Sequence, residues 1–367
     1  MKIASFESAI LNIPIDEPLA DSPEKPNQFR PTVMLRLRTD DRIEGIAVTF
    51  YAEALTKALH EAVITFGNLV IGEDPHCPEA ILRKLHAAAG SCGPAGIFTL
   101  AQSAIDMAVW DIRGKALSLP LWKLLGGTRN RVATYASGAL RRGLSDDQAA
   151  IAASRLKAKG FKEMKMQLAL PGDTNPVKEE RRARVVREAV GPEITLMCDI
   201  NQGWRPEQAI DIGRRIEDVR LAWLEDVTAC DDYEGLARVT AALSTPIAGG
   251  EYLWGAVPFR HMIEARSVDI IMIDMLRVGG VTPWLKVAAM AHSFNLPVVS
   301  HVIPEFHAHL IAAIPNGLTV EYMPWMLKLF QDTPEIENGE IVLTDRPGFG
   351  LTFDEAALKS FRVMSNT

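Results

Sequence analysis

Charged and titratable residues recur at the ends of short apolar segments in the C-terminal two-thirds of this 367-residue chain. Each segment has the length of a buried parallel strand, and successive charged residues are separated by enough chain for one strand, one helix and two loops. Buried strands exclude unpaired charges, but a (β/α)8 barrel builds its active site at the carboxyl ends of its strands. The pattern therefore predicts a barrel enzyme. The residues are Asp199, Glu225, Glu251, Asp274, His301 and Glu321, and their segments are Ile194–Asn201, Leu221–Val227, Pro246–Glu251, Asp269–Met275, Pro297–Val302 and Leu318–Tyr322.

Three of these acids are expected to bind a metal ion. Asp199, Glu225 and Glu251 end three consecutive predicted strands, so their carboxylates should lie side by side at the barrel mouth. Hard oxygen ligands without a neighbouring His or Cys favour one Mg²⁺ ion per active site. An isolated acid at a barrel rim is usually a salt-bridged residue, but three in register favour a metal site. Asn201 shares the strand face of Asp199 and is expected to hydrogen-bond a ligand or substrate.

The following strands carry a potential general base. A carboxylate that accepts a hydrogen bond from one ring nitrogen of a histidine orients the other nitrogen and raises its basicity. Asp274 and His301, on consecutive strands, are predicted to form such a pair facing the metal, whereas His307 and His309 are interpreted as structural. Glu321 is expected opposite a lysine of the second strand. If desolvated there, it would be protonated and able to donate a hydrogen bond to a developing oxyanion.

The barrel occupies only part of the chain. Residues 1–127 lack the strand–helix rhythm and are predicted to form an α+β capping domain, residues 128–323 a (β/α)8-type barrel, and residues 324–367 a segment that returns to the cap. The Pro-rich and charged segment 16–31 is expected to be a long loop, either a lid or disordered. The remaining predicted elements are strands at 2–13, 32–50, 132–137 and 162–167, and a helix at 100–117.

Composition argues against several classes of protein. The hydrophobic content of 48% indicates a globular protein with a substantial core, and the net charge of −7 provides no basic face for nucleic acid. No stretch has the roughly 18 uninterrupted apolar residues of a membrane span, and Glu7 interrupts any signal-like N-terminal segment. The four cysteines are spaced irregularly, fitting neither a zinc site nor a disulfide framework, so we expect reduced thiols in the cytoplasm. They are Cys77, Cys92, Cys198 and Cys230.

Two segments resemble signatures of the mandelate racemase and muconate lactonizing enzyme family, within the enolase superfamily. Residues 101–115 read AQSAIDMAVWDIRGK and resemble the cap-domain signature, and residues 196–202 read LMCDINQ and resemble the second signature. The likeness covers essentially the whole chain and implies Mg²⁺-assisted removal of a proton alpha to a carboxylate. It implies three metal ligands, Asp199, Glu225 and Glu251. It further implies the dyad Asp274–His301 of the mandelate racemase subgroup, with Glu321 as its hydrogen-bonding acid. The sixth strand, 269–275, lacks the lysine of the muconate and dipeptide-epimerase subgroups.

The second strand departs from the subgroup pattern. The subgroup usually has Lys-x-Lys, with the second lysine a base, and here the residues are Lys165-Met166-Gln167. The resemblance implies that Lys165 neutralises the substrate carboxylate and the enediolate, whereas Gln167 cannot accept and return a proton, although it could bind a substrate hydroxyl. Dehydration needs only one base, so we expect an acid sugar, aldonate or aldarate, to be converted to a 2-keto-3-deoxy acid. The alternatives are an epimerase, racemase or cycloisomerase using the same enediolate, and a non-catalytic binding barrel.

Cap segments are expected to complete the site. The loop 16–31 and the residues around Tyr51 resemble the loops that cover active sites in the family, which makes Tyr51 a candidate substrate contact. Arg30, Lys25 and Arg141 or Arg142 are candidate contacts to the distal end of a small carboxylate substrate, although ordinary solvated charge explains each equally well. The resemblance also implies a homo-oligomer built on dimers, with an octamer among the possible assemblies.

Overall fold

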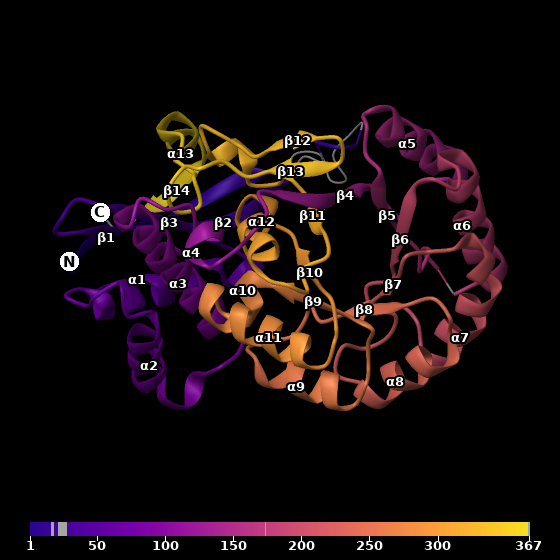
Figure 1. Cartoon of the computed structure of the whole chain (residues 1–367), viewed down its shortest axis with the longest axis horizontal. Coiled ribbons are helices and arrows are strands. Elements are labelled where there is room, and N and C mark those ends of the chain that lie inside the picture. Colours follow the sequence, from indigo (N-terminus) through magenta and orange to yellow (C-terminus); the bar gives the residue numbers. More distant parts are fainter. Residues whose placement is uncertain (16–17, 21–27, 173, 366–367) are drawn as a thin grey trace.

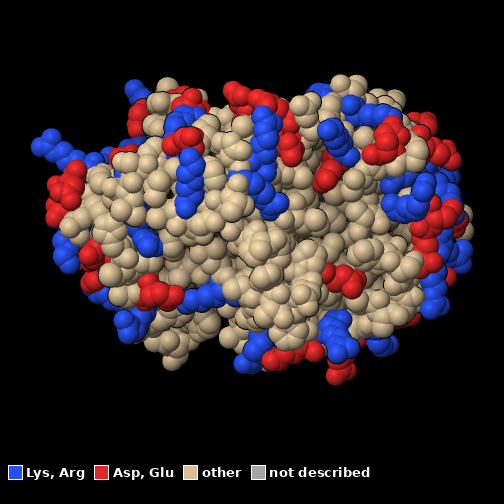
Figure 2. Space-filling view, in the orientation of Figure 1, with Lys and Arg blue, Asp and Glu red and all other residues tan. Residues whose placement is uncertain are grey.

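The chain folds into a barrel with a cap at one side, and both termini lie at the far end of the cap (Figure 1). The computed structural model describes residues 1–15, 18–20, 28–172 and 174–365. Within these residues, no helix is long and apolar enough to cross a membrane. Charged side chains of both signs gather toward the edges of the face drawn in Figure 2, and its centre is mainly uncharged.

The cap is built on an antiparallel sheet with the strand order β14-β1-β2-β3. Helices α1 and α3 pack against this sheet, and α2 packs on both of them. The longest helix, α3, is buried along most of its length. The bounds of the cap elements are β1 Ile3–Pro14, β2 Phe29–Thr39, β3 Glu44–Thr49, η1 Glu53–Leu55, α1 Thr56–Val70, α2 Pro78–Ala89, η2 Gly90–Cys92, α3 Ile97–Ala116 and α4 Leu121–Leu124.

Helix α3 contains the first signature segment, and its two buried acids join the cap to the rest of the molecule. Asp106 accepts hydrogen bonds from the backbone nitrogen and the hydroxyl of Thr282, both at 2.7 Å. Asp111 accepts from the backbone nitrogens of Ile46 and Phe349, at 3.0 and 2.9 Å. These acids therefore hold strand β3, a barrel helix and the C-terminal segment around one helix.

The barrel contains eight parallel strands among the described residues. Strands β4 to β10 pair in sequence order, β11 pairs with β4, and backbone hydrogen bonds between Val298 and residues 316–318 close the ring. The strands are β4 Arg131–Leu140, β5 Glu163–Gln167, β6 Thr195–Asp199, β7 Leu224–Glu225, β8 Ile247–Gly249, β9 Ile270–Asp274, β10 Val298–His301 and β11 Val320–Tyr322. The helices are α5 Asp146–Ala158, α6 Pro176–Val190, α7 Pro206–Arg215, η3 Glu217–Val219, α8 Tyr233–Ala242, α9 Val257–Glu264, α10 Met275–Val278, α11 Val281–Ser293 and α12 Pro304–Ala313.

An apolar layer fills the barrel beneath the predicted site. Its side chains form a cluster separate from the main core, and most of them precede a predicted site residue by two positions. Because alternate residues of a strand face the same way, the polar side chains at the strand ends lie one step further along the same inner surface. The layer consists of Tyr135, Met197, Trp223, Ala248, Ile270, Met272 and Val299.

Several predicted elements differ from the structure. Residues 32–50 were expected as one strand but form the hairpin β2–β3, because the chain turns at residues 40–43, where Arg42 has φ 64°. Residues 29–31, expected in the loop, extend β2, because they pair with residues 12–14 of β1. The rest of the expected loop falls largely on residues 16–17 and 21–27, outside the described residues. The barrel strands are mostly shorter than predicted, whereas β4 extends to Leu140.

The C-terminal segment contacts both parts of the molecule. Strand β13 (Glu340–Val342) pairs with β12 (Glu335–Glu337) and, antiparallel, with barrel strand β4. Further along, helix α13 (Glu355–Phe361) packs on β1, and β14 (Arg362–Ser365) joins the cap sheet. The segment also contains η4 (Leu327–Leu329). The return to the cap is thus observed, with an added contact to the barrel, and the boundaries 1–127, 128–323 and 324–367 stay a prediction.

Candidate active site

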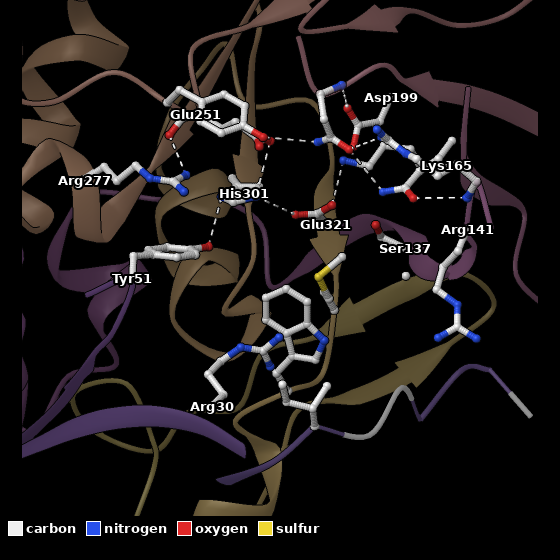
Figure 3. Close-up of a pocket in the computed structure, with 18 of the residues that line it drawn as sticks. Arg30, Tyr51, Ser137, Arg141, Lys165, Asp199, Glu251, Arg277, His301 and Glu321 are labelled. Atoms are coloured by element: carbon white, nitrogen blue, oxygen red, sulfur yellow. Dashed lines mark hydrogen bonds and ion pairs between the residues drawn. The ribbon is translucent and has the colours of Figure 1, made fainter. Parts of the chain in front are cut away.

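A cavity of about 590 Å³ lies at the carboxyl ends of the barrel strands, between barrel and cap (Figure 3). Eleven of the fourteen candidate site residues line it. Glu225 and Asp274 are buried directly behind the lining and contact residues that belong to it, and Lys25 lies outside the described residues. The lining residues predicted from sequence are Arg30, Tyr51, Arg141, Arg142, Lys165, Gln167, Asp199, Asn201, Glu251, His301 and Glu321.

The predicted histidine–carboxylate pair is present. Nδ1 of His301 lies 2.7 Å from Oδ2 of Asp274, and the two residues are register partners on β10 and β9. The other carboxylate oxygen, Oδ1, accepts the backbone N–H groups of Leu276 and Arg277, both at 2.8 Å, so Asp274 also caps helix α10. The carboxylate is therefore held from two sides and fixes the plane of the imidazole ring.

The second ring nitrogen of His301 faces the cavity. Nε2 lies 3.3 Å from Oε2 of Glu251 and 4.0 Å from Oε2 of Glu321. Burial alone would lower the pKa of His301, but Glu251, the bond to Asp274 and Glu321 together hold it above its usual value. The nitrogen that would exchange a proton with a substrate is thus directed to the acids of the site.

Glu321 was expected to be a protonated hydrogen-bond donor, and this expectation is wrong for the structure. Its Oε1 lies 2.7 Å from Nζ of Lys165, and its Oε2 accepts the backbone N–H of Val302 at 2.7 Å. Burial raises the pKa of Glu321, but the charges of Lys165 and His301 outweigh burial and hold the pKa below its usual range. The carboxylate therefore stays ionised. The residues near Glu321 in the sequence could not indicate this, because Lys165 and His301 come from other strands.

Glu321 also stabilises a strained turn after the dyad histidine. Val302 and Ile303 have φ values of 48° and 38°, which β-branched residues rarely adopt. The hydrogen bond from Val302 to Glu321 holds this turn, which leads from His301 into helix α12. The acid thus contributes to the position of the histidine.

Lys165 is buried between two acids. Its Nζ lies 2.5 Å from Oε1 of Glu225, opposite its contact to Glu321. Burial would lower the pKa of Lys165, but the two carboxylates raise it well above its usual value, so the lysine is charged. The second oxygen of Glu225 accepts the indole N–H of Trp223 at 2.9 Å, which orients this acid from below.

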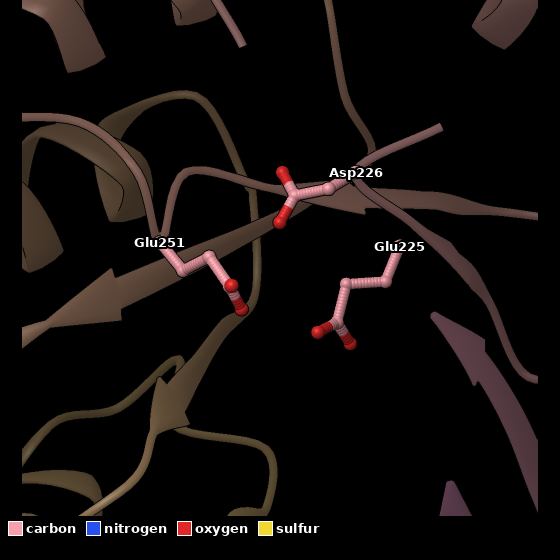
Figure 4. A group of neighbouring side chains, drawn as sticks. All are labelled: Glu225, Asp226 and Glu251. Carbon is pink, nitrogen blue, oxygen red and sulfur yellow. The ribbon is translucent and has the colours of Figure 1, made fainter. Parts of the chain in front are cut away.

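The predicted metal ligands gather at the mouth, with one acid that the sequence analysis missed. Asp199 and Glu225 are register partners on β6 and β7, and Glu251 follows β8. The three acids that can each place one carboxylate oxygen within 4.8 Å of the others are, however, Glu225, Asp226 and Glu251 (Figure 4). Asp226 has φ 43°, a left-handed conformation that the strand pattern does not predict. In the sequence, only its position directly after Glu225 indicated that Asp226 could belong to the acid cluster.

This cluster of acids fits a divalent cation. Oδ2 of Asp226 is buried and accepts no hydrogen bond. Burial raises the pKa of Asp199 to about 6 and that of Asp226 well above its usual value, and the neighbouring acids add to both shifts. Buried carboxylates that repel one another are stabilised by a cation, and all-oxygen donors suit Mg²⁺.

Gln167 and Asn201 belong to one hydrogen-bonded network. The Gln167 side chain accepts from the backbone nitrogen of Arg142 at 3.3 Å and donates to Oδ1 of Asn201 at 3.3 Å. The guanidinium of Arg142 donates to the same oxygen of Asn201, whose amide nitrogen lies 3.3 Å from the hydroxyl of Tyr252. These groups present amide and hydroxyl functions to the cavity, suited to binding hydroxyl groups.

Residues of the cap close the other side of the cavity. Tyr51 places its hydroxyl 3.5 Å from Nδ1 of His301, and the guanidinium of Arg30 stacks on the ring of Trp325, 3.5 Å from its centroid. Arg141 lines the cavity. Lys25 lies outside the described residues. Arg277, which no sequence pattern indicated, also lines the cavity beside Tyr51.

The fold and this site define a capped (β/α)8-barrel enzyme with one histidine–carboxylate dyad, a buried lysine and a cluster of acidic residues that can bind a metal ion. Residues 19–126 match the mandelate racemase/muconate lactonizing enzyme N-terminal domain, and residues 147–357 match the enolase C-terminal domain-like family. The chain therefore belongs to the mandelate racemase/muconate lactonizing enzyme family of the enolase superfamily. This confirms the resemblance and the fold class predicted from sequence.

Individual relatives act on acid sugars. An L-talarate/galactarate dehydratase of Salmonella typhimurium is 33% identical, covering 94% of this chain and 87% of the relative. A D-galactarolactone cycloisomerase of Agrobacterium fabrum is 29% identical over 99% of each chain. The crystal structure of an L-talarate dehydratase from Polaromonas sp. JS666, complexed with Mg and L-glucarate, superposes with a TM-score of 0.91 at 30% identity, covering 99% of this chain and 98% of that chain. Dehydratases and cycloisomerases are both among the relatives, as the sequence analysis expected.

Proposed function

We propose that this protein is a Mg²⁺-dependent sugar-acid dehydratase, a hydro-lyase that converts an aldonate or aldarate to a 2-keto-3-deoxy acid. The observation that carries the proposal is the single dyad, His301–Asp274, facing a charged lysine and an acid cluster across the cavity. The opposite wall carries an amide, Gln167, where a second base would be needed for racemisation.

Asp199, Glu225 and Glu251 would hold the metal ion, with Asp226 adjacent to them. A bound Mg²⁺ would withdraw charge from the substrate carboxylate and so acidify the neighbouring C–H group. Lys165, charged and buried, lies between Glu225 and Glu321 and is placed to neutralise the negative charge that develops on the carboxylate.

His301 would act first as base and then as acid. In the deprotonated form of His301, Nε2 takes the alpha proton, and the electron pair of the broken C–H bond forms the enediolate. The same nitrogen then returns the proton to the beta hydroxyl group, whose C–O bond breaks to release water. The resulting enol takes up a proton at carbon 3 and loses the proton of its hydroxyl group, which gives the 2-keto-3-deoxy acid. Asp274 holds the imidazole orientation throughout, through its 2.7 Å contact with Nδ1.

Glu321 has a supporting role in this scheme. Its ionised carboxylate orients Lys165 and the turn after His301, and it does not itself donate a hydrogen bond to the substrate. Gln167 and Asn201 would bind substrate hydroxyl groups, and Tyr51 would close the site beside the dyad.

The far end of the cavity favours a substrate with a second carboxylate. Arg30 and Arg141 lie away from Asp199 and Glu251 in Figure 3, one from the cap and one from the loop after β4. Arginine pairs well with carboxylates through its planar fork of donors. An aldarate therefore suits this cavity better than an aldonate of the same length.

A cycloisomerase is the second candidate function. The relative from Agrobacterium fabrum, 29% identical over the whole chain, carries this name, and lactone opening can use the same enediolate and the same dyad. A barrel that only binds a ligand is disfavoured because the dyad, lysine and acids are all in place.

The setting of the enzyme is also part of the proposal. The four cysteines are free in the structure, which supports the cytoplasm as a reducing compartment. A homo-oligomer built on dimers is proposed from the family membership. Size-exclusion chromatography with light scattering would test it, and a monomeric mass at micromolar concentration would reject it.

The test of the activity is a screen of mono- and di-acid sugars with Mg²⁺, scored by 2-keto acid formation. The control is His301→Asn, which is expected to lose turnover and to keep Mg²⁺ binding. Keto-acid formation that depends on His301 would support dehydration and identify the substrate. Solvent-deuterium exchange without keto acid would favour an isomerase, and turnover unchanged by His301→Asn would reject the assigned role.

A further inference from the structure

Arg277 joins three parts of the active site, although the proposed chemistry assigns it no role. It lies on α10, three residues after Asp274. Its Nη1 donates to the backbone oxygen of Glu251 at 2.9 Å and lies 3.8 Å from Oδ2 of Asp274. Only 11% of its side chain is exposed. One guanidinium group therefore contacts the backbone of a proposed metal ligand and the carboxylate of the dyad.

The flat face of the same guanidinium is packed among aromatic rings. Its Cζ lies 4.0 Å from the ring centroid of Tyr51, 5.0 Å from that of Tyr252 and 5.9 Å from that of Trp254. Tyr252 and Trp254 follow strand β8 of the barrel, whereas Tyr51 follows strand β3 of the cap. Planar guanidinium groups stack on aromatic faces in a way that a lysine ammonium cannot reproduce.

Tyr51 needs such a contact to keep its position. Its φ is 74°, a left-handed conformation that is unfavourable for a bulky residue and persists only where the surroundings hold it. In this position its ring stacks on His301, with centroids 6.2 Å apart and planes at 17°. Figure 3 shows Tyr51 below both Arg277 and the dyad histidine. The strained residue of the cap thus contacts two side chains of the barrel.

We propose that Arg277 is a positioning residue that couples closure of the cap to the dyad. By stacking on Tyr51 it keeps the cap against His301, and by binding the backbone of Glu251 it fixes the end of the neighbouring strand β8. This inference rests on the proposed function for its kinetic consequences, because the dyad is the reacting group. Loss of the contact between Arg277 and Tyr51 leaves the dyad intact, but the cap covers it less of the time. We therefore expect kcat to fall by a larger factor than KM changes.

A double-mutant cycle tests the coupling. Arg277→Met and Tyr51→Leu are each expected to lower kcat ~10-fold with KM changed less than ~3-fold, because each removes the same stacked contact. The double variant should be no more than ~2-fold slower than the slower single variant, since the contact can be lost only once. Effects of the two substitutions that multiply would overturn the proposal. The matched control is Arg260→Met, at an exposed position on α9, which should keep the wild-type kcat.

A conservative variant separates stacking from charge. Arg277→Lys keeps the positive charge but loses the planar fork, so it should recover only part of the lost kcat. A lysine variant with the full wild-type rate would overturn the positioning role, because charge alone would then suffice.

A measurement without substrate separates this proposal from the proposed function. Amide hydrogen exchange of residues 50–55 should become ~10-fold faster in Arg277→Met than in the wild type, because the segment opens locally when its anchor is lost. The Arg260→Met protein should show the wild-type exchange. If no acid sugar is turned over, the proposed function fails while the exchange experiment still decides the positioning role of Arg277. Unchanged exchange in Arg277→Met would reject that role even in an active enzyme.

Discussion

At the scale of single residues, the acids of the mouth raise the question of which of them bind the metal. Asp199 lines the cavity and is the register partner of Glu225. Asp226 belongs to the compact group of acids, Glu225, Asp226 and Glu251, but does not line the cavity. We expect a metal bound where substrate can reach it to use Asp199. The compact group would then be rearranged when the ion binds.

Magnesium-dependent thermal stability tests this assignment. Mg²⁺ at about 100 times its Kd should stabilise the wild type by about 2.7 kcal/mol, which raises Tm. Asp199→Asn should lose this rise. Asp226→Asn should keep it, and should be more stable than the wild type in EDTA, because it replaces a buried carboxyl group that burial and the neighbouring acids destabilise in its ionised form. The reverse pattern would make Asp226 a ligand in place of Asp199.

Gln167 poses the second question at this scale, since it stands where the subgroup usually has a base. Gln167→Leu should lower kcat/KM about 10-fold, the usual cost of one lost hydrogen bond to a substrate hydroxyl. Deuterium incorporation from D₂O should keep its stereochemistry, because His301 alone would exchange the proton. If Gln167→Leu lowered kcat as much as His301→Asn does, Gln167 would have more than a binding role. Steady-state kinetics and NMR of the recovered substrate provide both measurements.

At the scale of elements, helix α12 carries a buried histidine, His309, that connects three parts of the fold. Nδ1 of His309 lies 3.3 Å from the backbone nitrogen of Trp122, and Nε2 lies 3.1 Å from the backbone oxygen of Phe349, so the neutral ring bridges the barrel helix, α4 and the C-terminal segment. Burial lowers the pKa of His309 to about 4. A proton on Nδ1 would face an N–H group and break the bridge.

The sign of the pH effect follows from this lowered pKa. The folded state holds His309 neutral, so its contribution is complete above the unfolded pKa of 6.5 and is lost as pH falls toward 4, a change of about 3 kcal/mol. Urea unfolding between pH 7 and 4 should show a steeper loss of stability in the wild type than in His309→Gln. His292→Gln, at an exposed position, should follow the wild type. Parallel curves for His309→Gln and wild type would show that this histidine does not titrate in the window.

At the scale of the whole molecule, the C-terminal segment is tied to the cap by a charge cluster around Arg36. This arginine is 6% exposed and pairs with Glu7 and Glu44 at 3.0 Å and with Glu355 of α13 at 2.5 Å. A second arginine, Arg362, also reaches Glu7, at 2.7 Å. Chain ends that are far apart in sequence are thereby joined in one sheet.

Arg36→Met should weaken this junction. We expect a loss of about 2 kcal/mol in unfolding free energy, because three partly exposed acids lose the buried guanidinium group that they share, together with faster amide exchange in α13. Arg346→Met is the matched control, since its ion pair with Asp332 is exposed and such pairs contribute little. An Arg36 variant as stable as the Arg346 variant would show that apolar packing alone holds the segment.

The barrel, the cap and the positions of the site residues on their strands can be predicted from the sequence. Strand and helix periodicity is local, and parallel strands collect their carboxyl ends at one face. The ionisation of Glu321, the approach of Asp226 to Glu251 and the contact of Arg277 with Tyr51 depend on the three-dimensional fold. A pKa or a stacked contact depends on neighbours far away in the chain, and no local pattern records which neighbours those will be.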